Sequence, residues 1–178
     1  MTAPTPDLPA RTRLSDAAIE EQTAALAAPL AGDPGVQRSL LCFRCAGERF
    51  AIPAQDVQRV FESMPVRRVP HRDRPAFRGL VAHEGELLLV GSLERLLDLG
   101  MATPPPAPNA RMIVVGPEHH GWAFQADAVD GVVRVSEADL LPAPATLRRG
   151  LGTATRLLAR IDGEQAAVLH TEALLRGW

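Results

Sequence analysis

Lysine and tyrosine are missing from this 178-residue chain, and asparagine occurs once, as Asn109. All 19 basic residues are therefore arginine. Phosphate-binding loops of the common type, Schiff-base enzymes and serine–lysine dyads require a lysine, and tyrosine is a frequent general acid. The composition therefore excludes several catalytic designs, and we expect no catalytic residue and no enzyme activity.

Cysteine is scarce as well, with only Cys42 and Cys45. Two thiols are too few for a disulfide framework and agree with a reducing compartment. Their spacing is that of a redox or zinc motif, but residues three apart on a strand point to opposite faces. The histidines at 71, 83, 119, 120 and 170 supply no ligand pair at helical spacing. We therefore predict buried core cysteines, no metal site and no cofactor.

Charge and hydropathy indicate a folded globular chain, with 46% hydrophobic residues, 22% charged residues and a formal net charge of −2. No apolar run approaches the roughly 18 to 20 residues that span a bilayer, and the first residues lack the apolar stretch of a secretory signal. We expect a cytoplasmic protein without direct membrane insertion. The slight acidity provides no field that attracts nucleic acid.

Residues 1–37 are rich in Ala, Pro and Thr and are expected to form a flexible or loosely docked extension. They contain one short helix candidate with Ser15 as its N-cap. Its apolar stripe of Ile19, Leu26 and Leu30 is thin, so this helix should not nucleate a core. Residues 38–178 are expected to form the folded domain.

From Ser39 onward the hydrophobic period changes to alternation, and turn signals recur every dozen residues or so. This pattern predicts a mostly-β fold of small barrels or a sandwich, with short helices at 93–97 and 171–175. The prolines of 103–110 are expected to form a surface connection between two β-rich halves. The expected strands are 39–45, 49–53, 57–61, 66–69, 79–83, 87–90, 112–115, 121–126, 129–135, 155–161 and 165–169.

From Ser39 to Trp178 the order of elements resembles the CheW family of chemotaxis coupling proteins. The central stretch Phe77–Leu89 is similar to the family's Gly-hydrophobic-x-Asn-x-Arg-Gly signature, and Trp122–Val132 to its Val-Asp-x-Val strand pair. The residues at the motif positions are most similar to those of the WspD branch. Further similar segments are Leu41-Cys42-Phe43-Arg44 with Gly47, Ile52-Pro53, Val57–Phe61, Val69-Pro70-His71, Ser92-Leu93 and Leu141–Pro144.

The resemblance implies two intertwined five-stranded barrels of the SH3-like kind and a non-catalytic adaptor without a cofactor. It implies two partners, the regulatory domain of a CheA-type histidine kinase and the cytoplasmic hairpin tip of a methyl-accepting chemoreceptor. The pathway would be chemotaxis-like or Wsp-type surface sensing, at the inner face of the membrane through receptor arrays. Carried over by motif position, the receptor-binding set is Val57, Arg59, Gly79, Glu84, Gly85, Ala123 and Val132, and the kinase-binding set is Phe61, Leu87, Leu88 and Leu89.

The chain departs from the family signature at two positions, since Glu84 stands where Arg is usual and Ala82 where Asn is usual. Many relatives have an acidic residue where Arg59 stands, so the two charges look exchanged. We therefore predict that Arg59 and Glu84 pair on adjoining strands of the first barrel.

Arginines 67, 68, 72, 74 and 78 crowd into twelve residues and support a rival class, a small nucleic-acid-binding β-barrel. That class requires interleaved aromatics, and only Phe77 is present. The adaptor interpretation is therefore preferred, with no nucleic-acid partner. An enzyme is the weakest of the three classes, because no triad, metal set or phosphate loop supports it.

Overall fold

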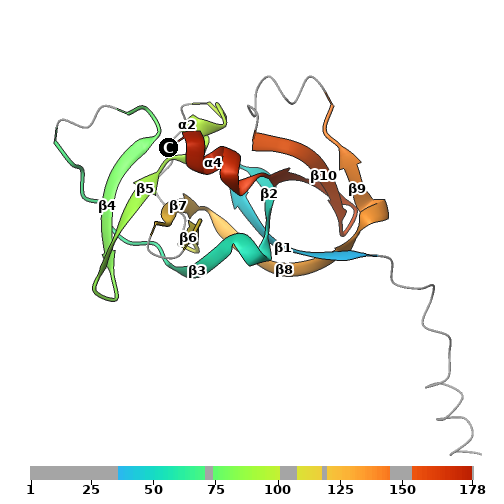
Figure 1. The fold of residues 1–178 in the computed structure, drawn as a ribbon, viewed down its shortest axis with the longest axis horizontal. Helices are drawn as coiled ribbons and strands as arrows, with labels where there is room; N and C mark the ends of the chain where they lie inside the picture. The colour runs from blue at the N-terminus through green and yellow to red at the C-terminus, as the bar shows by residue number, and fades with distance from the viewer. Residues whose placement is uncertain (1–35, 71–73, 101–107, 118–119, 145–153, 178) are drawn as a thin grey trace, which may run out of the picture. The chain divides into compact units, whose positions relative to one another are not determined.

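The computed structural model describes residues 36–70, 74–100, 108–117, 120–144 and 154–177. The predicted helix at Ser15 and most of the proline-rich segment lie outside these residues. The described chain is mostly β, with two short α-helices and two 3-10 turns (Figure 1). The elements are β1 Gln37–Cys45, β2 Glu48–Pro53, η1 Ala54–Asp56, β3 Val57–Glu62, β4 Phe77–His83, β5 Glu86–Gly91, α2 Leu93–Leu96, β6 Arg111–Val115, β7 Trp122–Ala126, β8 Ala128–Ser136, η2 Glu137–Asp139, β9 Leu140–Pro142, β10 Thr155–Ile161, β11 Glu164–Leu169 and α4 Thr171–Gly177.

The strands form two sheets, a six-stranded sheet in the order β8-β1-β2-β11-β10-β9 and a five-stranded sheet in the order β3-β6-β7-β5-β4. Among the described strands, only β11–β2 and β5–β7 pair in parallel. The chain gives its first two and last four strands to one sheet, and its middle five to the other. Figure 1 shows this exchange, with blue β1 and cyan β2 beside the orange and red strands from the end of the chain.

This topology corrects one expectation about the proline-rich segment. Residues 103–110 lie between α2 and β6, and the strands on either side, β5 and β6, belong to the same five-stranded sheet. The chain changes sheet instead at η1 and at the β7–β8 junction. Prolines mark an irregular connection, but they carry no information on which sheet the flanking strands join. One sheet also has a sixth strand, β9, which the alternation pattern does not predict.

Strand β1 divides its side chains between two cores, as its alternation predicts. Leu41, Phe43 and Cys45 enter the largest apolar cluster, while Leu40 and Cys42 enter a second one. A strand that is buried on both faces presents alternate residues to different neighbours. The alternating apolar residues of β1 therefore contribute to both of these apolar clusters.

Both cysteines are free and buried, and their predicted opposite orientation is confirmed. Burial raises the pKa of the Cys45 thiol far above its usual range, and the carboxylates of Glu94 and Asp127 raise it further. Burial likewise raises the pKa of Cys42, where Arg49 acts in the opposite direction. Both thiols therefore stay protonated at neutral pH. The described residues contain no group of three or more side chains that could hold a metal ion.

The segment 66–69, predicted as a strand, makes only one bridge, between Arg67 and Leu80. Two backbone hydrogen bonds of 2.8 Å join these residues. Prolines 65 and 70 flank the segment and have no N–H to donate, which prevents a longer ladder.

No described helix is long and apolar enough to span a membrane.

Candidate interaction surface

Strands β3 and β4 are the two outer strands of the five-stranded sheet, yet their side chains meet. The rings of Phe61 on β3 and His83 on β4 stack with centroids 3.7 Å apart and planes inclined by 6°. No described backbone hydrogen bond pairs these two strands. The contact between their side chains therefore shows that the sheet is curled, with its two outer strands close together. The stack places the β4–β5 hairpin beside β3.

An ion-pair cluster lies next to this stack. The Arg59 guanidinium donates a hydrogen bond to the carboxylate of Glu86 and lies 3.8 Å from a carboxylate oxygen of Glu84. The same Glu84 oxygen is 3.8 Å from Nε2 of His83. The predicted Arg59–Glu84 pair is confirmed. The expectation that both residues lie on adjoining strands is wrong, because Glu84 lies in the turn between β4 and β5, and β3 is not a hydrogen-bonded neighbour of β4 in the described sheet.

Glu86 was not singled out in the sequence, although it is the closer partner of Arg59. His83 pairs with Glu86 across a two-residue turn, in which Glu84 has φ 48° and Gly85 has φ 84°. Positive φ at both central residues is typical of a tight hairpin turn that matches strand twist. Glu84 therefore projects from the turn, with a side chain 73% exposed, while Glu86 begins β5.

Alternation along β5 separates the predicted kinase-binding leucines. Leu87 and Leu89 are 72% and 37% exposed, whereas Leu88 is 6% exposed and belongs to the core under the five-stranded sheet. The two exposed leucines border a groove of about 450 Å³, which we call the leucine groove. Its lining is Gln58, Arg59, Glu86, Leu87, Leu88, Leu89, His120, Gly121 and Trp122.

One wall of the leucine groove is fixed by Gln58, whose side-chain amide donates to the carbonyls of Gly116 and Pro117 at 2.7 and 2.6 Å. These bonds connect β3 to the turn that follows β6. The groove thus combines a fixed polar wall, an ion pair at one end and two exposed leucines. Such a mixture of an apolar centre and a polar rim is typical of protein–protein contacts.

Comparisons with known proteins agree with this architecture. The sequence model of the CheW-like domain matches residues 39–177. The chain belongs to the CheW-like domain family. In structure it is similar to the scaffolding protein TtCheW from Thermoanaerobacter tengcongensis, with a TM-score of 0.65 and 18% identity over 76% of this chain and 90% of that chain. A comparison with curated protein sequences gave no match.

The predicted receptor-binding residues of this CheW-like chain do not form one surface. Arg59, Glu84 and Gly85 lie together at the hairpin, whereas Val132 is 59% exposed on β8 of the other sheet. Val57 is half-buried against the main core. These five predicted receptor-binding residues therefore lie in three separate environments.

The remaining predicted residues offer no side chain to a partner. Ala123 is 0% exposed within the core of the five-stranded sheet, and Gly79 is buried where the chain passes Arg67. Leu88 is buried for the reason given above. Motif position alone does not show which face of a strand a residue takes, so we do not place Ala123 and Gly79 in a contact surface, and Leu88 only backs the leucine groove from the core.

Proposed function

We propose that this protein is a non-catalytic scaffold that couples chemoreceptors to a CheA-type histidine kinase. Its membership of the CheW-like family supports this proposal, and so does its structural similarity to the scaffolding protein TtCheW. The observation that carries it is the leucine groove, where Leu87 and Leu89 are exposed beside a paired arginine. Exposed apolar side chains that adjoin a groove with a polar rim are a feature of partner-binding surfaces.

The kinase regulatory domain is the proposed occupant of the leucine groove. Burial of one leucine side chain stabilises a complex by about 1.5 to 3 kcal/mol, so Leu87 and Leu89 supply a substantial part of the affinity. Phe61 takes part indirectly, since its stack with His83 holds the hairpin that carries both leucines. Leu87→Asp should therefore weaken kinase binding more than tenfold.

The matched control is Leu141→Asp, because Leu141 is 38% exposed on β9 of the other sheet. Isothermal titration calorimetry with the kinase regulatory domain compares the two variants, and circular dichroism verifies that both fold. Equal affinities for Leu87→Asp and the unmodified chain would remove the leucine groove from the proposal.

The receptor tip is proposed to contact the end of the β4–β5 hairpin, where Arg59, Glu84 and Gly85 lie together. Reversed charge at Glu84 would repel a receptor that presents a carboxylate to the usual arginine. The double variant Arg59→Glu/Glu84→Arg should bind such receptors more tightly than the unmodified chain does. Binding to a panel of receptor tips tests this, and an unchanged order of affinities would contradict it.

The Wsp-type surface-sensing assignment and a location at the inner face of the membrane belong to the proposal as well. The Wsp-type assignment rests on the residues Pro70-His71-Arg72 and Gly85-Glu86-Leu87-Leu88-Leu89 and on the N-terminal extension, and the location follows from the proposed association with receptor arrays. Affinity capture from the native organism, followed by mass spectrometry of the kinase and receptor recovered, tests them. Recovery of a flagellar chemotaxis receptor alone would contradict the Wsp assignment.

A further inference from the structure

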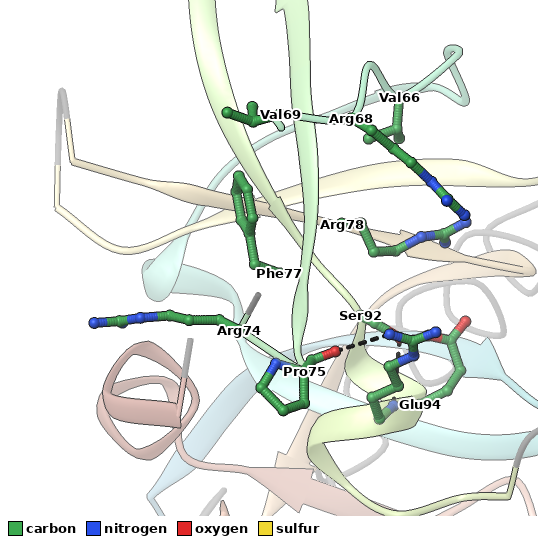
Figure 2. Close-up of a pocket in the computed structure, with 10 residues that line it drawn as sticks. Val66, Arg68, Val69, Arg74, Pro75, Phe77, Arg78, Ser92 and Glu94 are labelled. Carbon is green, nitrogen blue, oxygen red and sulfur yellow. Dashed lines mark hydrogen bonds between the residues drawn. The ribbon is translucent and has the colours of Figure 1, made fainter. Parts of the chain in front are cut away.

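A second cavity, separate from the leucine groove, lies between the segment before β4 and the start of α2. It has a volume of about 640 Å³ and a lining rich in arginine, and we call it the arginine pocket (Figure 2). The lining residues are Val66, Arg68, Val69, Arg74, Pro75, Phe77, Arg78, Ser92, Glu94 and Arg95. None of them belongs to the lining of the leucine groove.

The charges of the arginine pocket are unbalanced. Among the described lining residues there are four arginines and one carboxylate, that of Glu94, which accepts a hydrogen bond of 2.7 Å from the hydroxyl of Ser92. Arg95 donates to the Pro75 carbonyl at 3.1 Å, a contact that leaves its charge without a carboxylate. Within the described residues, the side chains of Arg68 and Arg78 have neither an ion pair nor a hydrogen bond.

The positions of two guanidinium groups indicate where an anion would be held. Figure 2 shows Arg68 and Arg78 reaching to the same side of the pocket, whereas Arg74 extends toward the opposite side. Like charges that approach each other in a hollow repel, and an anion between them removes that repulsion. The guanidinium fork matches the geometry of phosphate and carboxylate oxygens.

Apolar side chains form the rest of the wall. Val66, Val69 and Phe77 are half-buried, and the Phe77 ring makes an edge contact with Trp122 at a centroid distance of 6.0 Å. This contact fixes the ring orientation. A cavity of this volume lies within the range of small-ligand sites, which combine apolar walls with a few convergent polar groups.

We propose that the arginine pocket binds a phosphate-bearing small molecule, with Arg68 and Arg78 holding the phosphate and Phe77 contacting the remainder of the ligand. A phosphate places up to two charges on one group, which suits two guanidiniums on one side of a pocket. An acidic peptide spreads its carboxylates along a chain. A nucleic acid requires a row of stacking aromatics, and the pocket has only Phe77.

The test is calorimetric titration of the full chain with inorganic pyrophosphate and, separately, with ADP, at low ionic strength. Arg68→Gln and Arg78→Gln should each weaken pyrophosphate binding about tenfold or more, because each removes charge-assisted hydrogen bonds. Glu94→Gln should strengthen it several-fold, since the amide keeps an acceptor for Ser92 but loses the negative charge. A purely structural role of Glu94 does not predict a gain in affinity.

The matched control is Arg160→Gln, on β10 of the other sheet, which should leave pyrophosphate affinity unchanged. Thermal unfolding of each variant verifies that it is folded. Several results would overturn the proposal: absence of binding at millimolar pyrophosphate and ADP, equal affinities in Arg68→Gln, Arg78→Gln and Arg160→Gln, or binding of a glutamate-rich peptide in place of both phosphate compounds.

Discussion

Phe61 and His83 stack face to face at 3.7 Å although they lie on the two outer strands of the five-stranded sheet. Aromatic contacts of this kind contribute about 0.5 to 1.5 kcal/mol beyond the apolar area that they bury. Because the described strands share no backbone pairing at this place, the side chains hold the edges together. The position of the β4–β5 hairpin, and with it the leucine groove, depends on this contact.

Replacement of Phe61 by alanine should lower the free energy of unfolding by roughly 1 to 3 kcal/mol, less than for a fully buried phenylalanine because Phe61 is half-buried. Urea unfolding followed by circular dichroism measures it. His83→Phe retains a stacking ring and should stay within about 0.5 kcal/mol of the unmodified chain. Unchanged stability in Phe61→Ala would show that the stack does not hold the hairpin.

The ion-pair cluster predicts unequal coupling of Arg59 to its two acids. Glu86 accepts a hydrogen bond from Arg59, whereas Glu84 is 3.8 Å away and has a side chain 73% exposed. Double-mutant cycles in urea unfolding should give a coupling near 0.5 to 1 kcal/mol for Arg59 with Glu86, and close to zero for Arg59 with Glu84. A larger coupling with Glu84 would reverse this order and contradict the described geometry.

Several of these features follow from the sequence, and others depend on tertiary arrangement. The alternation of β1 and the two strands expected at 79–83 and 87–90 are local patterns, and both are correctly predicted from the residues. The proximity of Arg59 to Glu84 was also predicted, from an apparent exchange of charges. Each of these inferences uses information carried within a few residues or by a motif.

The features that the residues do not predict depend on which strands meet. Glu86 becomes the partner of Arg59 only when the five-stranded sheet curls, which no local pattern specifies. The burial of Ala123 and Leu88 depends on which face of each strand is covered. The arginine cluster was evident in the sequence, but its pocket includes Arg95, which comes from a distant segment.

Gly79 on β4 lies where the backbone of Arg67 approaches this strand, and a substitution there tests that close approach. A Cβ at this position would lie 2.2 Å from the carbonyl oxygen of Arg67, and the φ of 146° is unfavourable for other residues. Gly79→Ala should therefore lower the free energy of unfolding by more than about 2 kcal/mol. Gly163→Ala is the control, because its φ is 81° and a Cβ there meets nothing within 4 Å.

Gly163→Ala retains the strain of positive φ and should lose only about 1 kcal/mol. Denaturant unfolding of both variants provides the comparison. Equal losses would mean that backbone conformation alone, and not the contact with Arg67, requires glycine at position 79.

The cysteines predict a loss of stability in alkali. Because the pKa values of Cys42 and Cys45 are raised in the folded state, their contribution is fully present below the unfolded value of about 8.5 and is lost as pH rises above it. The slope should approach about 1.4 kcal/mol per pH unit for Cys45, and Cys42 should add to it in the same direction. The chain has no lysine or tyrosine side chain to titrate in the same range.

Denaturant unfolding between pH 8 and 11 measures this slope, and Cys45→Ala provides the comparison. The alanine variant is less stable at neutral pH because it leaves a small cavity, but its stability should fall less steeply in alkali. The same slope in Cys45→Ala and in the unmodified chain would show that this thiol does not ionise on unfolding.

The proposed scaffold engages a receptor and a kinase at the same time. The direct measurement is size-exclusion chromatography with light scattering on the full chain, a chemoreceptor hairpin-tip fragment and the kinase regulatory domain. We expect one species that contains all three, and in Leu87→Asp a species that has lost the kinase domain but keeps the receptor fragment. Elution of the unmodified chain apart from both partners at micromolar concentrations would contradict the scaffold function.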